Sequence, residues 1–86
     1  MKVSIEITLA PLQQEYEAPI KSFIRSLRAS AFQIIENPLS TQIYGEFTPL
    51  MEFLTQTIET SFDEIAAGMV HLKIVKSDRS DYQPFV

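Results

Sequence analysis

The sequence predicts an α+β fold with the element order β-α-β-β-α-β, because two hydrophobic periods alternate along a chain long enough for one domain. Apolar residues recur at every second position in three segments, and at every third or fourth position in two longer ones. The first period is typical of strands with one buried face, and the second of amphipathic helices. At 86 residues, the chain can build a single hydrophobic core.

The first predicted strand runs from Val3 to Leu9, where apolar side chains alternate with Ser4, Glu6 and Thr8. We expect Pro11 to stop it. A helix follows, which Pro19 helps to start. Its apolar stripe has spacings of three and four and comprises Tyr16, Ile20, Phe23, Ile24, Leu27 and Ala31.

A hairpin is predicted next, from a short β-prone run at 32–36, a turn at Asn37-Pro38 and an alternating run at 40–47. Gly45 inside the second strand indicates a bulge or a close backbone approach. Thr48 and Pro49 form an N-cap and first-turn pair for a second helix, which we expect to end at Gly68. The apolar stripe of that helix comprises Leu50, Met51, Leu54, Ile58, Phe62 and Ile65.

The last strand is predicted at 69–76, with Val70, Leu72 and Ile74 alternating against His71, Lys73 and Val75. Two right-handed crossovers then place both helices on one face of a four-stranded antiparallel sheet of order 4-1-3-2, a ferredoxin-like βαββαβ domain. We expect this domain at 1–76 and a tail at 77–86. Phe53, which lies off the helical stripe, and the tail residues Tyr82, Phe85 and Val86 are expected at a subunit contact, with fraying of the chain end as the alternative for the tail.

Eleven acidic and seven basic residues give a net charge of −4, which disfavours nucleic acids and anionic membranes as partners. No apolar run approaches the length of a membrane span, and the N-terminus has no leader pattern. The absence of cysteine from the sequence excludes disulfides, so we expect a cytoplasmic protein.

Period-two alternation assigns Glu6, Gln42, Tyr44 and Glu46 to the sheet face that carries no helix. A carboxylate there can hold an aminopyrimidine through charge-assisted hydrogen bonds, and Tyr44 can stack on the ring or face a cation. The alternative is an ordinary solvated face on which Ser40 and Thr41 shape the hairpin, with Gln42 pairing across the strands.

Two segments resemble the thiamine-binding, YkoF-type family of small ferredoxin-like proteins. These are Val3 to Ile7 with Pro11-Leu12, and Asn37 to Glu46, and the likeness extends to about Lys76. It implies binding of thiamine or its hydroxymethylpyrimidine moiety, in uptake, salvage or homeostasis, and assembly into homodimers or homotetramers. Ala10 stands where the family usually has an aromatic residue. The ligand-binding residues that the likeness and the face predict are Glu6, Ser40, Thr41, Gln42, Tyr44 and Glu46.

No enzyme is expected, because the sequence lacks a cysteine nucleophile, a phosphate-binding glycine loop and a plausible serine triad. His71 is the single histidine, so neither a metal site nor a cofactor is expected. An RNA-binding module would need paired aromatic and basic residues on the open face. The alternative that stays open is a structural or regulatory protein that associates with itself and binds no small molecule.

Overall fold

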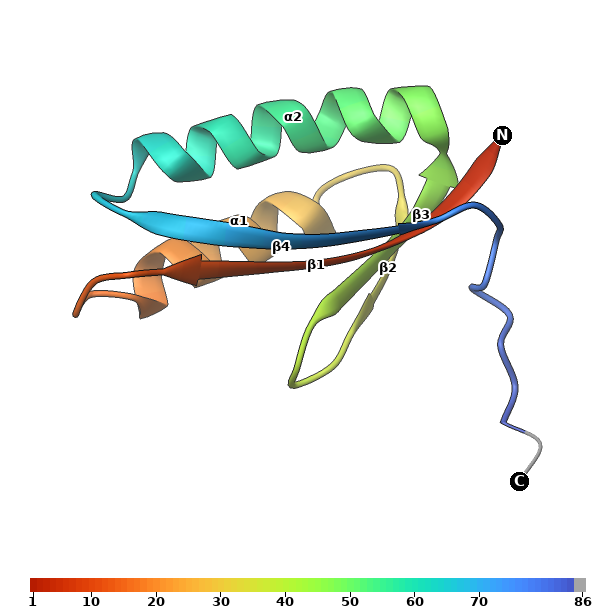
Figure 1. Cartoon of the computed structure of the whole chain (residues 1–86), viewed down its shortest axis with the longest axis horizontal. Helices are drawn as coiled ribbons and strands as arrows, with labels where there is room; N and C mark the ends of the chain where they lie inside the picture. The colour runs from red at the N-terminus through yellow and green to blue at the C-terminus, as the bar shows by residue number, and fades with distance from the viewer. Residues whose placement is uncertain (85–86) are drawn as a thin grey trace.

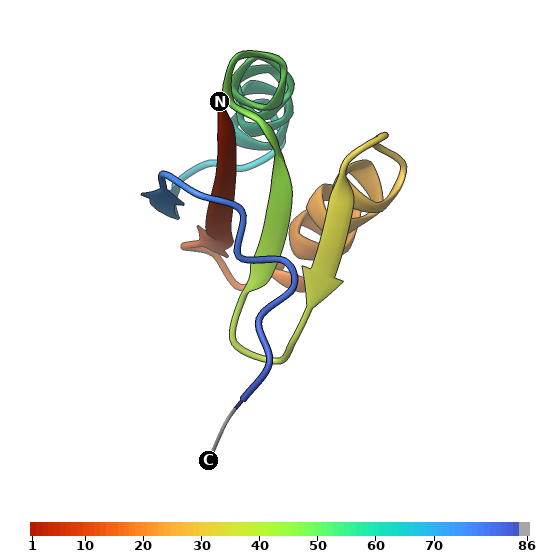
Figure 2. The same cartoon turned by 90° about the vertical axis from the view of Figure 1, so that its right-hand side faces the viewer.

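The computed structural model describes residues 1–84 and has the predicted order of elements (Figure 1). The sheet is antiparallel with the order β2-β3-β1-β4, and both helices lie on one side of it (Figure 2). This confirms the ferredoxin-like α+β fold. The elements are β1 (Lys2–Pro11), α1 (Glu17–Arg28), β2 (Gln33–Glu36), β3 (Thr41–Glu46), α2 (Phe47–Asp63) and β4 (Gly68–Val75).

The strand registers fix which side chains share a face. In the central pair, Ser4 of β1 lies opposite Tyr44 of β3, and Glu6 lies opposite Gln42. Directly opposed residues point to the same side of a sheet. These four side chains therefore share the helix-free face, as the alternation predicts.

The other face of the sheet forms the core. Its β1 residues are almost fully buried against both helices, and each such side chain stabilises the fold by roughly 1.5–3 kcal/mol. The buried hydrophobic set is Val3, Ile5, Ile7, Leu9, Phe23, Leu27, Ile43, Leu50 and Leu54.

The start of α2 differs from the prediction. The helix begins at Phe47, Glu46 occupies the N-cap position, and no side chain caps the helix, so the assignment of Thr48 as N-cap is wrong. The N–H of Phe47 instead donates to the carbonyl of Met1 at 2.9 Å, so the end of the β1 ladder satisfies this donor. Pro49 is the third helical residue, where its missing N–H costs nothing.

Helix α2 ends at Asp63, so the assignment of Gly68 as its end is wrong, and Gly68 is instead the first residue of β4. The buried stripe of α2 differs from the expected one in part, at Phe62 and at two polar positions. Leu50, Leu54, Thr57 and Ser61 are buried, whereas Phe62 is 44% exposed. The Thr57 hydroxyl can be buried because it donates to the Phe53 carbonyl at 2.9 Å. Packing against the sheet therefore selected a stripe that includes two small polar residues.

Phe53 packs within the chain, with its ring centroid 5.6 Å from that of Phe32. Phe32 also explains Gly45, because a Cβ at that position would lie 2.7 Å from its ring. The β1–β3 register runs through Val3 and Gly45 without an inserted residue. Of the two predicted roles for Gly45, the structure shows the close approach.

After β4 the tail turns across the helix-free face (Figure 2). Ser4 Oγ donates to the Ser77 carbonyl at 2.7 Å and accepts from the Arg79 N–H at 2.8 Å. One end of the open face is therefore covered by the chain itself. Packing of the tail on a neighbouring subunit stays a prediction, and Phe85 and Val86 lie outside the described residues.

Neither helix within residues 1–84 has the length and apolar character needed to cross a membrane.

Candidate functional site

A cleft lies where β1 extends beyond the end of its neighbour β3. The β1–β3 pairing stops at Ile7 and Thr41, whereas β1 continues to Pro11 and pairs there with β4 alone. The β2–β3 turn projects beyond this point (Figure 1). Between the turn, β1 and α1 the structure leaves a cleft of about 310 Å³.

The cleft has an apolar wall and a rim of mostly polar residues. The wall consists of core residues of β1 and the inner side of α1, namely Ile7, Leu9, Ile20, Phe23 and Ile24. The rim consists of Thr8 and the hairpin residues Glu36, Asn37, Pro38, Leu39, Ser40 and Thr41. A mostly apolar lining with a few polar groups is typical of small-molecule sites, and the volume lies at the lower end of their usual range.

The hairpin turn that forms the rim is held in one conformation. Asn37 Oδ1 accepts from the N–H groups of Leu39 and Ser40, both at 3.0 Å. The Asn37 N–H in turn donates to the Ser40 carbonyl at 3.1 Å. This side-chain turn places Ser40 at the mouth of the cleft.

Ser40 connects the cleft to Glu6 on the open face. Its hydroxyl donates to Glu6 Oε2 at 3.0 Å, and Lys73 Nζ lies 3.9 Å from Glu6 Oε1. Glu6 borders another, smaller hollow of about 250 Å³ together with Thr8, His71, Leu72 and Lys73. The Glu6 carboxylate therefore lies directly behind the rim.

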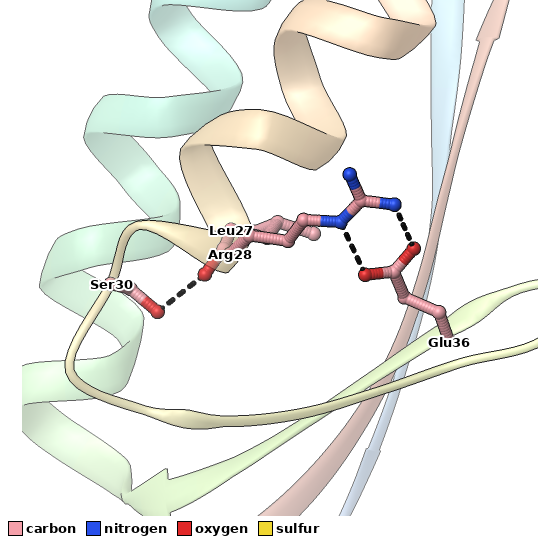
Figure 3. Close-up of polar contacts among 4 residues, drawn as sticks. All are labelled: Leu27, Arg28, Ser30 and Glu36. Carbon is pink, nitrogen blue, oxygen red and sulfur yellow. Dashed lines mark hydrogen bonds and ion pairs between the residues drawn. The ribbon is translucent and has the colours of Figure 1, made fainter.

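Glu36 forms the β2 side of the rim and is held by Arg28 at the end of α1 (Figure 3). The guanidinium Nε and Nη2 atoms donate to the two carboxylate oxygens at 2.7 and 2.8 Å. Hydrogen bonding to Arg28 lowers the pKa of Glu36 and raises that of Arg28. The bidentate pair ties β2 to α1 and keeps an ionised carboxylate at the cleft.

Glu46 lies at the opposite end of the sheet from Glu6. Glu46 Oε2 accepts from the Met1 ammonium at 2.7 Å, and this hydrogen bond lowers the pKa of Glu46. Its partner in the register is Lys2, four residues before Glu6 on β1, or roughly 13 Å along the strand. A single pyrimidine ring cannot contact both carboxylates.

Tyr44 lies between the two ends of the face. Burial raises the pKa of its hydroxyl, with further contributions from the charges of Asp78 and Glu6. Asp78 belongs to the tail, which is anchored at Ser4, the register partner of Tyr44. The ring of Tyr44 is therefore close to the tail.

Of the six predicted residues, the structure gathers three at the cleft. Ser40 and Thr41 line it, and Glu6 contacts Ser40, while Gln42 lies beside Glu6 on the open face. Thr41 is 4% exposed and points to the helix side, because it is paired with Ile7. Tyr44 and Glu46 are not brought to the cleft.

The sequence prediction missed Glu36 and the α1 wall. The spacing of Ile20 and Ile24 indicated only a core stripe, and nothing local distinguished Glu36 from other exposed acids. Asn37 had been identified only as a turn residue. The signal that was available was the resemblance of the 37–46 segment to the YkoF-type family, because that segment contains Asn37, Ser40 and Thr41 together.

The arrangement suits a flat, partly apolar molecule that carries hydrogen-bonding groups and positive charge. The apolar wall can pack on a ring, and the Glu6 carboxylate, whose Lys73 partner lies 3.9 Å away, favours a cation. The charge of Glu36 is already compensated by Arg28, so Glu36 offers the cleft a hydrogen-bond acceptor. In the described part of the chain, no three His, Asp or Glu side chains are grouped so that they could hold a metal ion.

Comparison with solved structures shows the same fold in proteins of similar length. Protein SP2199 from Streptococcus pneumoniae superposes with a TM-score of 0.84 at 28% identity, covering 94% of this chain and 92% of that one. A candidate thiamine biosynthesis/salvage protein from Thermotoga maritima, TM0486, gives a TM-score of 0.82 at 18% identity, covering 90% and 85%.

A protein of the domain-of-unknown-function family DUF77 from Bacillus cereus gives a TM-score of 0.73 at 15% identity, covering 99% of this chain and 79% of that one. No family model matches the sequence, and no curated protein matches it. The chain is thus similar in structure to these proteins, and the two likenesses below 20% identity concern the fold.

Proposed function

We propose that this protein binds thiamine or its hydroxymethylpyrimidine moiety in the cleft beneath the 37–40 turn, as a member of the thiamine-binding family that its sequence resembles. The observation that carries the proposal is that Ser40 and Thr41, in the segment that most resembles the family, line the rim of this cleft opposite its apolar wall. The structural similarity to a candidate thiamine biosynthesis/salvage protein supports it.

Each part of the cleft has a role in this proposal. The aminopyrimidine ring packs between Ile24 and Phe23 of α1 and the end of β1, and the Thr41 hydroxyl hydrogen-bonds it from the rim. The Glu6 carboxylate stabilises the positive charge of a thiazolium or a protonated pyrimidine, and Glu36, which is paired with Arg28, accepts a hydrogen bond from the ligand at the rim. We propose a binding role in uptake, salvage or homeostasis, with no catalytic step.

Calorimetric titration with thiamine and with hydroxymethylpyrimidine tests this function. Binding should also raise the melting temperature, because ligand at a hundred times its dissociation constant adds about 2.7 kcal/mol to the free energy of unfolding. If neither compound produces heat or a thermal shift, the proposed ligand class is wrong.

The Thr41→Val variant tests whether the cleft is the site. It removes one hydroxyl and keeps the side-chain shape, so we expect binding to weaken by roughly three- to ten-fold with little loss of stability. Thr57→Val is the matched control, since Thr57 is also a buried threonine and lies outside the cleft lining. If the Thr41→Val variant and the wild type bind with equal affinity, the ligand does not bind at Thr41 in this cleft.

We also propose self-association into a homodimer or homotetramer. The observation that favours it is the outer strand β4, where Met69, Leu72 and Ile74 are each about two-fifths exposed next to an unpaired strand edge. Light scattering at micromolar concentration tests it, and a monomer would contradict it. Assembly without any binding in the titration would favour the structural alternative.

A further inference from the structure

At the cleft, the direction of the main-chain N–H and C=O groups of β1 alternates from residue to residue. In an antiparallel sheet, successive residues of a central strand direct their N–H and C=O groups to opposite neighbours. The Leu12 N–H donates to the Ala67 carbonyl at 2.9 Å, and these residues continue the β1–β4 register beyond Pro11 and Gly68. Even-numbered residues of β1 therefore bond toward β4.

A bond at the other end of β1 agrees with this assignment. The Met1 carbonyl accepts from the Phe47 N–H at 2.9 Å, and this pair continues the β1–β3 register beyond Lys2 and Glu46. Odd-numbered residues therefore bond toward β3. The last of them with a β3 partner is Ile7, opposite Thr41.

Leu9 is the next odd-numbered residue, and its continued register would place it opposite Leu39. Leu39 lies instead in the turn, where it is 87% exposed and gives its N–H to Asn37 Oδ1. The main-chain N–H and C=O of Leu9 thus point into the gap beyond β3. Within residues 1–84, no hydrogen bond from another part of the chain reaches either group.

The Leu9 groups are scarcely exposed to solvent. Leu9 as a whole is 5% exposed and lines the cleft. More than nine in ten buried main-chain polar groups are hydrogen-bonded, so a donor and an acceptor directed together into a cleft are a strong sign of a ligand edge. Pro11, the next odd-numbered residue, has no N–H and cannot extend this edge.

We propose that the main-chain N–H and C=O of Leu9 form the hydrogen-bonding edge of the cleft, and that they pair with the adjacent ring nitrogen and amino group of an aminopyrimidine. The ring nitrogen accepts from the N–H, and the amino group donates to the C=O. The ligand takes the place that a longer β3 would have occupied. The choice of ligand class rests on the proposed function. The unpaired N–H and C=O of Leu9 follow from the strand register alone.

This pairing predicts selectivity by the amino group. Hydroxymethylpyrimidine can form both bonds, whereas its desamino analogue leaves the Leu9 carbonyl buried without a partner. We expect the analogue to bind about ten-fold more weakly in a calorimetric titration, the ratio that corresponds to one lost hydrogen bond in a buried site. Equal affinities would overturn the pairing while leaving the proposed function in place.

Amide hydrogen exchange of the full chain, measured by NMR, tests the edge directly. In the free protein, the Leu9 amide should exchange at least ten-fold faster than those of Ile5 and Ile7, which bond to β3. Saturation with hydroxymethylpyrimidine should slow the Leu9 amide by at least ten-fold. The Ile5 and Ile7 amides serve as internal controls for general stabilisation by ligand.

The outcomes are distinct. A Leu9 amide as protected as Ile7 in the free protein, or one unchanged at saturation, overturns the proposed edge even if the compound binds. Failure of the compound to bind at all overturns the proposed function, and with it the pairing to an aminopyrimidine. The exchange rate of the free protein then still decides whether Leu9 has an unpaired edge.

Discussion

The two ends of the β1–β3 pair carry the same alternating pattern but use their polar residues differently. At the N-terminal end, Ser4 bonds twice to the tail and Glu46 bonds to the Met1 ammonium. At the hairpin end, Ser40 and Glu6 contact each other at the mouth of a cleft. At one end of this face, the polar residues thus hold the chain termini in place. At the other end, they lie beside an accessible cleft.

The difference arises from strand length. β1 has ten residues and β3 has six, so β3 can cover only part of β1. At the N-terminal end, the start of α2 continues the ladder through the Phe47–Met1 bond. At the hairpin end the tight turn removes Leu39 from the ladder, and the cleft opens in its place.

The largest effect is expected at the wall of the cleft. Phe23→Ala should lower the free energy of unfolding by about 3–5 kcal/mol, because Phe23 is fully buried and its loss leaves a cavity. Phe62→Ala is the matched control and should cost less, since Phe62 is 44% exposed. Urea denaturation of both variants measures this, and a loss below about 1 kcal/mol for Phe23→Ala would contradict its place in the core.

A smaller effect is expected at the tail anchor. Ser4→Ala should cost about 1–2 kcal/mol, because it removes a nearly buried hydroxyl that both donates and accepts. Ligand affinity should not change, since the cleft lies at the other end. Ser26→Ala is the control, because its hydroxyl bonds only within an exposed turn of α1.

The Ser4→Ala variant has a second readout in Tyr44. Burial and the charge of Asp78 raise the pKa of the Tyr44 hydroxyl above its usual 10.0, so its contribution to stability is present below that pH and is lost as the pH rises through the folded-state pKa. Release of the tail should return the pKa toward 10.0 in an ultraviolet titration of a Tyr16→Phe, Tyr82→Phe background. An unchanged pKa would mean that the tail stays in place.

The smallest effect is expected for Glu36 and Glu46, two exposed carboxylates at opposite ends of the sheet whose pKa values are lowered. Their stabilising contribution is present above the unfolded-state value near 4.5 and is lost as the pH falls below it. Glu36→Gln and Glu46→Gln should each flatten the acid side of the stability profile slightly. Only Glu36→Gln should weaken binding of thiamine, and equal effects of both variants on affinity would contradict the separation of the two ends.

Much of the fold followed from local pattern. The alternation from Val3 to Leu9 predicted both the strand and its buried face, and the stripe around Phe23 and Leu27 predicted α1. The shared face of Glu6 and Gln42 also followed, because a side-chain period of two leaves no other arrangement in this register. Thr48 and Phe62 were misassigned, since long-range contacts decided the first turn and the buried side of α2.

The sequence by itself determined the order of elements, the faces of the strands and the residues available for binding, because these depend on spacing within a few residues. The tertiary structure decided which of those residues meet. Where β3 stops against β1, how the tail crosses Ser4 and which acid pairs with Arg28 all depend on contacts between segments distant in the chain. Local periodicity does not determine where the pairing of two strands ends, and the cleft lies where the β1–β3 pairing ends.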